Sequence, residues 1–311
     1  MPTRSFREEN KLFKQARDMA KKYSGRNDFL DIQFGLKKIE NNLTNDLSIR
    51  FHVKKKKAKN KLKANELIPG KIGKFKTDVI EYKPKLQTVI VEPFVETRPV
   101  LGGIEIQSDL FNQRTNWGTI GCSLSFNDVL FGITNYHVVF GGLNEDQVNQ
   151  HVNQLLLFQP NKPNFGTEIG LVGSAFSQKL DYCLFRLKEN PNSSQAINRI
   201  NGIVSGFANP LIGQKLAKVG AATNLTFGIV EARSLVDISK IIIRFAPDPG
   251  NESPKISNGG DSGSVWFTGS PGEPEKLKLV ALHFGGDVVK NIAFANLFSS
   301  IIPSINQKIK L

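Results

Sequence analysis

The stretch GGDSGS at residues 259–264 decides how this chain of 311 residues is interpreted. Glycines on either side of Asp261 and Ser262 let the backbone turn tightly, so that Ser262 Oγ stands clear of the chain. The backbone N–H groups of Gly260 and Ser262 then converge on one point, where they would hold the oxygen of a tetrahedral intermediate. The motif therefore predicts a nucleophilic serine with an oxyanion hole. Because the same residues also favour ordinary tight turns, the motif needs partners elsewhere in the chain.

A general base and an orienting acid stand earlier in the sequence. His137 follows a largely apolar run at residues 129–133, as a residue at the end of a β-strand would. Asp181 opens another apolar stretch, residues 182–185. Without Ser262, His137 would be better explained as a buried core histidine. With it, the three residues follow the chain order His, Asp, Ser.

This order and the local sequence resemble the chymotrypsin-fold serine peptidases, in which the three residues come together from two β-barrels. The likeness is to the disulfide-free, trypsin-like peptidases of bacteria and plants, and in part to the glutamyl endopeptidases. Beyond the serine motif, it is carried by GTIGC at residues 118–122, VGAATNLTFG at 219–228 and ALHFGG at 281–286. The resemblance implies a mainly β fold of two six-stranded antiparallel β-barrels with a C-terminal helix.

The resemblance also implies a reaction, the hydrolysis of peptide bonds through an acyl-enzyme and without a cofactor. His137, oriented by Asp181, would take the proton of Ser262 as its hydroxyl attacks the carbonyl. Glu168 and Asp128 are alternatives for the acid, but neither begins an apolar strand in the interval where this fold places it. The alternative function is a degenerate scaffold that keeps the motifs without the catalytic geometry.

The residues before and after the serine bear on which bond is cut. Ile256 stands where trypsin-type pockets carry an aspartate, so nothing there would neutralise a buried lysine or arginine side chain. Ser257, His283, Phe284 and Gly285 resemble the substrate-binding positions of the glutamyl endopeptidases. A histidine beside a hydroxyl would donate hydrogen bonds to a carboxylate. We therefore expect cleavage after glutamate or another acidic or small polar residue, although His283 is also explained as a core histidine.

Asp261 is not expected to be a catalytic acid. In relatives made as zymogens, the equivalent side chain pairs with a newly released amino terminus. Nothing in this sequence says which group Asp261 pairs with.

The chain divides into an N-terminal α+β domain with its linker, residues 1–98, and a peptidase domain, residues 99–311. The N-terminal domain also resembles the leader domain of the bacterial peptidases. Periodicity and composition predict the following elements: a helix at Phe6–Tyr23, strands at Leu30–Leu36, Leu47–Val53 and Thr77–Tyr82, an extended linker at Lys83–Val100, and a closing helix within Ala293–Leu311 with Pro303 in its first turn.

Composition favours a cytoplasmic enzyme. No apolar run approaches the length of a membrane span, and the first residues lack the apolar core of a secretory signal. Cys122 and Cys183 stand in apolar strand contexts and are expected to be buried thiols, with a disulfide between them left open. The four histidines are scattered and neither cysteine has metal-site spacing, so no metal is predicted.

Positive charge is concentrated in the N-terminal domain. The formal net charge is +13, and Lys54–Lys57, Lys59, Lys61 and Lys63 form a basic loop. Such a run is usually a solvated loop, but it also suits an acidic partner or nucleic acid. Aromatic residues are not interleaved with the lysines, which argues against base stacking. We therefore expect a protein or peptide substrate, allow a regulatory partner at the N-terminal domain, and keep nucleic-acid binding as the second function class.

Overall fold

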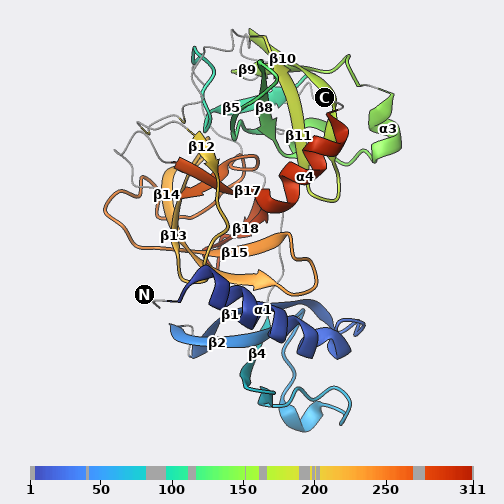
Figure 1. Cartoon of the computed structure of the whole chain (residues 1–311), viewed down its shortest axis with the longest axis vertical. Coiled ribbons are helices and arrows are strands. Elements are labelled where there is room, and N and C mark those ends of the chain that lie inside the picture. The colour runs from blue at the N-terminus through green and yellow to red at the C-terminus, as the bar shows by residue number, and fades with distance from the viewer. Residues whose placement is uncertain are drawn as a thin grey trace. The chain divides into compact units, whose positions relative to one another are not determined.

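In the computed structural model, β-strands are the main regular structure of the chain (Figure 1). The described residues are 4–39, 42–81, 96–110, 117–150, 152–160, 167–188, 197, 200, 204–268 and 277–309. Most of the predicted linker lies outside them. None of the described helices is long and apolar enough to cross a membrane.

Contacts between residues divide the chain into two compact units. The first, the amino-terminal unit, consists of Met1–Pro84, Pro210–Gln214 and Ile229–Ile243. The second, the catalytic unit, consists of Lys85–Asn209, Lys215–Gly228 and Arg244–Leu311. By contacts, two later segments therefore group with the N-terminal residues. The functional boundary expected near residue 98 stays a prediction.

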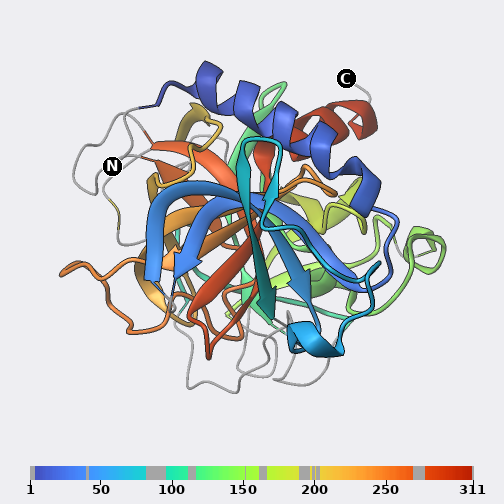
Figure 2. The same cartoon turned by 90° about the horizontal axis from the view of Figure 1, so that it is seen from below.

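The amino-terminal unit is built on a small sheet with one long helix. The elements that precede the linker are α1 (Phe6–Ala20), the 3-10 turns η1 (Lys21–Tyr23) and η2 (Lys59–Lys61), and strands β1 (Phe29–Ile39), β2 (Asn42–Val53), β3 (Lys71–Ile72) and β4 (Phe75–Glu81). A capping box of Ser5 and Glu8 starts α1, which lies alongside β1 and β2 in Figure 2. The predicted helix and three strands are confirmed, with the last turn of the helix wound as η1.

The same unit takes in the end of strand β14 (Asn224–Ser234), which pairs antiparallel with β1. Phe34 lies opposite Arg233 in this pairing. The strands approach closely at Gly35, where a Cβ atom would lie 2.4 Å from the Cβ of Ala232. Apolar side chains of α1 and of the sheet then form one core, in which the rings of Phe13 and Phe34 meet edge to face.

The first sheet of the catalytic unit holds seven strands among the described residues and forms a half-barrel. Its strands, in spatial order, are β6 (Gly118–Thr119), β5 (Glu105–Ser108), β9 (Leu156–Gln159), β10 (Thr167–Ser177), β11 (Tyr182–Leu187), β8 (Val129–Thr134) and β7 (Cys122–Phe126). The β7–β8 hairpin turns at Asn127 and Asp128, whose positive φ angles of 47° and 60° suit a tight hairpin turn. Short helices α2 (Tyr136–Phe140) and α3 (Glu145–Asn149) follow β8.

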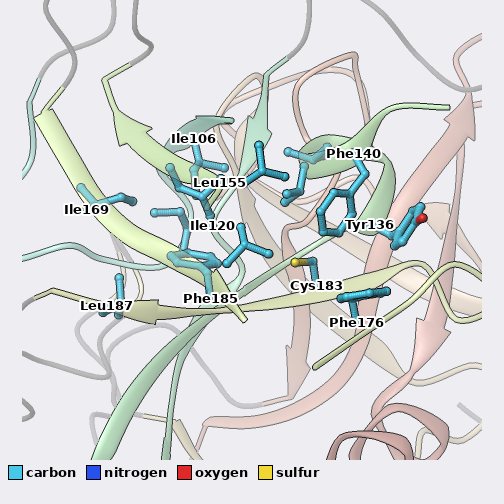
Figure 3. Close-up of a cluster of buried hydrophobic side chains, with 14 of the residues drawn as sticks. Ile106, Ile120, Tyr136, Phe140, Leu155, Ile169, Phe176, Cys183, Phe185 and Leu187 are labelled. Atoms are coloured by element: carbon cyan, nitrogen blue, oxygen red, sulfur yellow. The ribbon is translucent and has the colours of Figure 1, made fainter. Parts of the chain in front are cut away.

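Aromatic side chains fill the core of this half-barrel. Figure 3 shows Tyr136, Phe140 and Phe176 beside Cys183, and the ring centroids of Phe140 and Phe176 are 5.3 Å apart. Cys122 and Cys183 are both free and buried, as predicted, so no disulfide joins them. Burial raises the pKa of both thiols well above its usual value, so neither is a reactive thiolate.

The second barrel is a closed ring of six strands. They are, in spatial order, β13 (Lys215–Gly220), β16 (Val265–Thr268), β17 (Leu277–Asp287), β18 (Ile292–Leu297), β15 (Lys240–Phe245) and β14, which pairs back to β13. A short strand, β12 (Val204–Phe207), runs parallel to β17. The predicted fold class, mainly β with a C-terminal helix, is confirmed.

The closing helix α4 (Phe298–Lys308) is shorter than the range given for it. Residues 292–297 form strand β18, and all six are buried between neighbouring strands. A short, continuous apolar run is compatible with a buried strand or with a buried helix, so its pattern cannot distinguish them. Pro303 was placed wrongly in the first turn, because the helix already starts at Phe298 and Pro303 therefore lies in its interior.

Candidate active site

His137 and Asp181 are joined by two hydrogen bonds in the catalytic unit. His137 Nδ1 lies 2.8 Å from Asp181 Oδ2, and the backbone N–H of His137 donates to Asp181 Oδ1 at 3.0 Å. The paired carboxylate fixes the plane of the imidazole and leaves Nε2 as the free ring nitrogen. The side chain of His137 keeps 25% of its surface exposed, so a substrate can reach it. This geometry is the one that a general base requires.

Two asparagines hold the backbone at Asp181. It lies at the start of β11 with a φ of 48°, and its carbonyl accepts a hydrogen bond of 2.7 Å from Asn135 Nδ2. The preceding carbonyl, that of Leu180, accepts from Asn296 Nδ2 at 2.8 Å. Asparagines from the N-cap of α2 and from β18 therefore fix the position of the acid.

The alternative acids lie elsewhere. Asp128 occupies the β7–β8 turn, at the end of β8 remote from His137. Glu168 lies near the start of β10 and forms an ion pair with Lys188. Among these acids, Asp181 is the one bonded to the histidine.

Ser262 lies in the tight turn between β15 and β16, in the segment that the sequence singles out. Gly260 has a φ of 96° and Gly263 a φ of 95°, a left-handed region that favours glycine. The backbone N–H groups of Gly260 and Ser262 donate to no acceptor in the part of the chain that the structure describes. Two unpartnered, neighbouring amides beside a serine are what an oxyanion hole needs.

Gly118 and Thr119 of β6 bring the serine turn next to the histidine segment. A Cβ atom at Gly118 would lie 2.4 Å from Cγ2 of Val138, the neighbour of His137, and 2.7 Å from the carbonyl oxygen of Ser262. Thr119 donates from its N–H to the Ser262 carbonyl at 2.7 Å and from Oγ1 to the Gly260 carbonyl at 2.7 Å. No hydrogen bond joins Ser262 Oγ to His137 within the described residues. Catalytic hydrogen bonds of this type often form only with substrate bound.

Asp261 points away from the surface into a fully satisfied polar site. Both Asp261 and Lys218 are 0% exposed, and Lys218 Nζ lies 3.0 Å from Asp261 Oδ2. Thr223 contributes its hydroxyl at 2.7 Å and its N–H at 3.0 Å. The N–H groups of Ala222 and Asn258 each donate at 3.0 Å. The partner that the sequence left unnamed is therefore Lys218.

Both members of this pair have shifted pKa values. Burial opposes the ionisation of Asp261, but the charge of Lys218 and the hydrogen bonds from Thr223 and Asn258 outweigh it and lower the pKa of the carboxyl. Burial lowers the pKa of Lys218, and Asp261 opposes that shift. The cost of burying an ion pair is offset only where the other lone pairs and protons of the two groups are also hydrogen-bonded. The carboxylate of Asp261 meets this condition.

The predicted specificity residues are brought together but are buried. Ser257 Oγ lies 2.7 Å from His283 Nε2, and His283 has no exposed surface. Burial, together with the charge of Lys218, lowers the pKa of His283 to about 3, so the ring is neutral near neutral pH. Phe284 is half-buried and stacks on Phe294 at 6.2 Å, while Gly285 is buried in β17.

Several residues that shape the site were missed by sequence reasoning: Trp117, Thr119, Asn135, Lys218, Thr223 and Asn296. Trp117 packs so closely on the serine turn that a Cβ atom at Gly260 would lie 2.0 Å from its ring. The sequence held a signal for one of these residues, because Lys218 interrupts the otherwise apolar segment 216–219. No cluster of metal-ligating side chains occurs among the described residues.

The arrangement defines a chymotrypsin-like fold: histidine and acid on the half-barrel, serine on the loop before β16, and a C-terminal helix packed on β10, β17 and β18. The chymotrypsin-like fold that the sequence resemblance implied is thus confirmed.

Comparisons with known proteins give likenesses at low identity. A scan against protein-family models finds no match, and no curated protein matches the sequence. Among solved structures, the chain is similar to "a glutamic acid specific serine protease", at 17% identity and a TM-score of 0.47, covering 66% of this chain and 97% of that one. It is also similar to Thermobifida fusca Protease A (17%, TM-score 0.43, 65% and 94%) and to a Cellulomonas bogoriensis chymotrypsin (16%, TM-score 0.42, 66% and 94%).

Proposed function

We propose that the protein is a serine endopeptidase that hydrolyses peptide bonds through an acyl-enzyme. The observation that carries the proposal is the combination of a carboxylate-bound histidine with two unpartnered amides at a glycine-flanked serine. His137 takes the proton of Ser262 as Oγ attacks the peptide carbonyl, and it returns that proton to the leaving amine. Asp181 holds the ring and stabilises its charged form.

The oxyanion hole is formed by the N–H groups of Gly260 and Ser262. As the tetrahedral intermediate forms, its oxygen accepts hydrogen bonds from these two N–H groups. Both donors are already in position, so the protein does not have to reorganise. Lys218 supplies the buried cation for Asp261 from within the chain. The serine turn therefore does not need an amino terminus released by cleavage to hold its conformation.

Preference for an acidic or small polar residue before the scissile bond is the finer part of the proposal. It rests on the Ser257–His283 pair and on Ile256, which offers no charge to a basic side chain. Both members of the pair are buried, so the pair must become accessible when such a side chain enters. Profiling a peptide library with wild type and His283→Ala tests this part, and cleavage mainly after arginine would contradict it.

The test of the activity compares Ser262→Ala with Ser264→Ala. Ser264 is a suitable control because its hydroxyl is buried two residues away and has no hydrogen-bond partner to lose within the part of the chain that the structure describes. We expect Ser262→Ala to reduce peptide hydrolysis by about a thousandfold or more with the melting temperature nearly unchanged. Ser264→Ala should keep most of the activity. A wild-type protein that hydrolyses no peptide in the library would support the degenerate scaffold instead.

A further inference from the structure

The amino-terminal unit contains a cavity of about 440 Å³ that the proposed hydrolysis does not use. This volume lies in the range of roughly 300–1,000 Å³ that is usual for small-molecule sites. The cavity is bounded by the ends of β1, β2 and β4 and by the loop that carries η2. Six apolar side chains line it: Phe29, Val53, Leu62, Leu67, Ile68 and Val79.

The apolar lining is accessible. Leu67 is 44% exposed, and the other five apolar side chains are only partly buried. Two neighbours hold Phe29 in place, since its ring centroid lies 5.0 Å from that of Phe51 and 4.6 Å from the guanidinium of Arg26. Accessible apolar surface on a concave, supported floor favours a ligand with an apolar body.

The mouth of the cavity is positively charged. Lys54–Lys57 line it, against two carboxylates that already have cationic partners. Asp28 is bound by Arg26, and Glu66 is bound by Lys57 at 3.0 Å. The side chains of Lys54, Lys55 and Lys56 are exposed and make no ion pair or hydrogen bond with the residues that the structure describes. Three uncompensated cations therefore stand beside an apolar floor.

We propose that this cavity binds an amphipathic anion, an apolar chain or ring that carries one carboxylate or phosphate. The apolar part lies on the floor formed by Phe29, Val53 and Val79, and the anionic group meets Lys54–Lys56 at the mouth. A nucleic acid fits these features less well, because base stacking needs several aromatic faces and Phe29 is the one aromatic side chain among the described residues that line the cavity.

The test is isothermal titration of the full chain with sodium decanoate, below the concentration at which decanoate self-associates. Decanol and acetate serve as matched probes, because one has the chain without the charge and the other has the charge without the chain. We expect one saturable site for decanoate, binding at least about tenfold weaker for decanol, and no detectable binding of acetate. Affinity for decanoate should fall as salt is added, since salt screens the exposed lysines.

Variants locate the site. Replacing Lys54, Lys55 and Lys56 together with glutamine should weaken decanoate binding about tenfold, because exposed charge pairs contribute modestly one by one and all three lysines are removed. The triple control Lys61→Gln, Lys63→Gln, Lys71→Gln removes the same charge from exposed lysines that do not line the cavity and should leave binding within about twofold. Leu67→Asp places an exposed carboxylate at the floor and should also weaken binding.

Three outcomes would overturn the proposal. They are the absence of saturable decanoate binding by the wild type, an equal loss of affinity in both triple variants, and binding to anionic phospholipid vesicles without binding to monomeric decanoate. The last result would indicate a membrane surface as the ligand. All these measurements concern binding and therefore stand whether or not the chain hydrolyses peptides.

Discussion

Each of the two units holds a buried ion pair, and the two pairs differ in how completely they are satisfied. In the catalytic unit, Asp261 receives Lys218 and a set of further donors, and both side chains are 0% exposed. In the amino-terminal unit, Arg50 of β2 binds Glu231 of β14, and both are 1% exposed, but Nε and Nη1 of Arg50 have no hydrogen-bond partner among the described residues.

This difference indicates that the two ion pairs have different roles. Leaving buried donors unpaired costs free energy, so the Arg50–Glu231 pair has a smaller net stabilising effect than its burial suggests. Its role is to join β14 to the sheet of the amino-terminal unit. The Lys218–Asp261 pair is built without such losses and adjoins Ser262, which indicates that it fixes the conformation of the serine turn. The following predictions test this contrast.

The largest expected effect is that of Lys218→Met. The variant leaves the Asp261 carboxylate buried without a cation, a change that usually costs about 3–5 kcal/mol of unfolding free energy. The serine turn should also lose its conformation, so hydrolysis should be abolished. Urea unfolding and hydrolysis rates measure the two effects.

The double variant Lys218→Met, Asp261→Asn separates stability from positioning. Removing both charges should restore much of the unfolding free energy, because no buried charge remains. The hydrolysis rate should stay low, since an amide cannot accept all the hydrogen bonds that hold the turn. A rate that recovers in step with stability would mean that the pair has only a structural role.

Gly260→Ala tests the turn itself. A Cβ atom there would lie 2.0 Å from the Trp117 ring, and the φ of 96° is unfavourable for alanine. We expect the amide of residue 260 to be displaced and the rate to fall by about a hundred- to a thousandfold, as for the loss of one oxyanion donor. Gly142→Ala is the matched control, because nothing lies within 4 Å of a Cβ atom at that position.

A smaller effect is expected from pH. The pKa of His283 is about 3 in the folded protein against an ordinary 6.5, so between these values the unfolded chain binds a proton that the folded chain does not. Stability should therefore fall as the pH is lowered from 6.5 towards 3, by at most about 1.4 kcal/mol per pH unit from this group. Unfolding at pH 5 to 6.5 should show a shallower slope for His283→Gln than for wild type. Equal slopes would mean that His283 is not buried as a neutral ring.

The smallest effect is expected from Arg50→Met. Lys38 Nζ lies 3.7 Å from Glu231 and keeps a cation near it, while the unpaired nitrogens of Arg50 are removed. The unfolding free energy should fall by about 1–2 kcal/mol, less than for Lys218→Met, and the hydrolysis rate should not change. A rate that changes more than the stability would show that the amino-terminal unit regulates the active site.

Much of this account was predictable from the sequence because the signals are local. The glycines around Ser262 require positive φ angles, and apolar strands precede His137 and follow Asp181. These patterns pointed to Ser262, His137 and Asp181, of which the structure joins His137 to Asp181. The fold class followed from the resemblance of the surrounding sequence to chymotrypsin-fold peptidases.

The remainder depends on contacts between distant residues. Lys218 and Asp261 meet only in the folded barrel, and a single lysine in a strand does not reveal its partner. The range Ala293–Leu311 given for the closing helix took in most of strand β18, because a short apolar run has no decisive periodicity. Pairing of Gly35 with Ala232 likewise depends on the packing of strands far apart in sequence.

A serine that is activated as a nucleophile by this fold should react with a fluorophosphonate probe. Treating the full chain with such a probe, and locating the adduct by peptide mass spectrometry, shows directly whether Ser262 is that serine. The account predicts one adduct, on Ser262, which is lost in Ser262→Ala and Lys218→Met and retained in Ser264→Ala. An unlabelled wild-type protein, or an adduct that persists in Ser262→Ala, would contradict it.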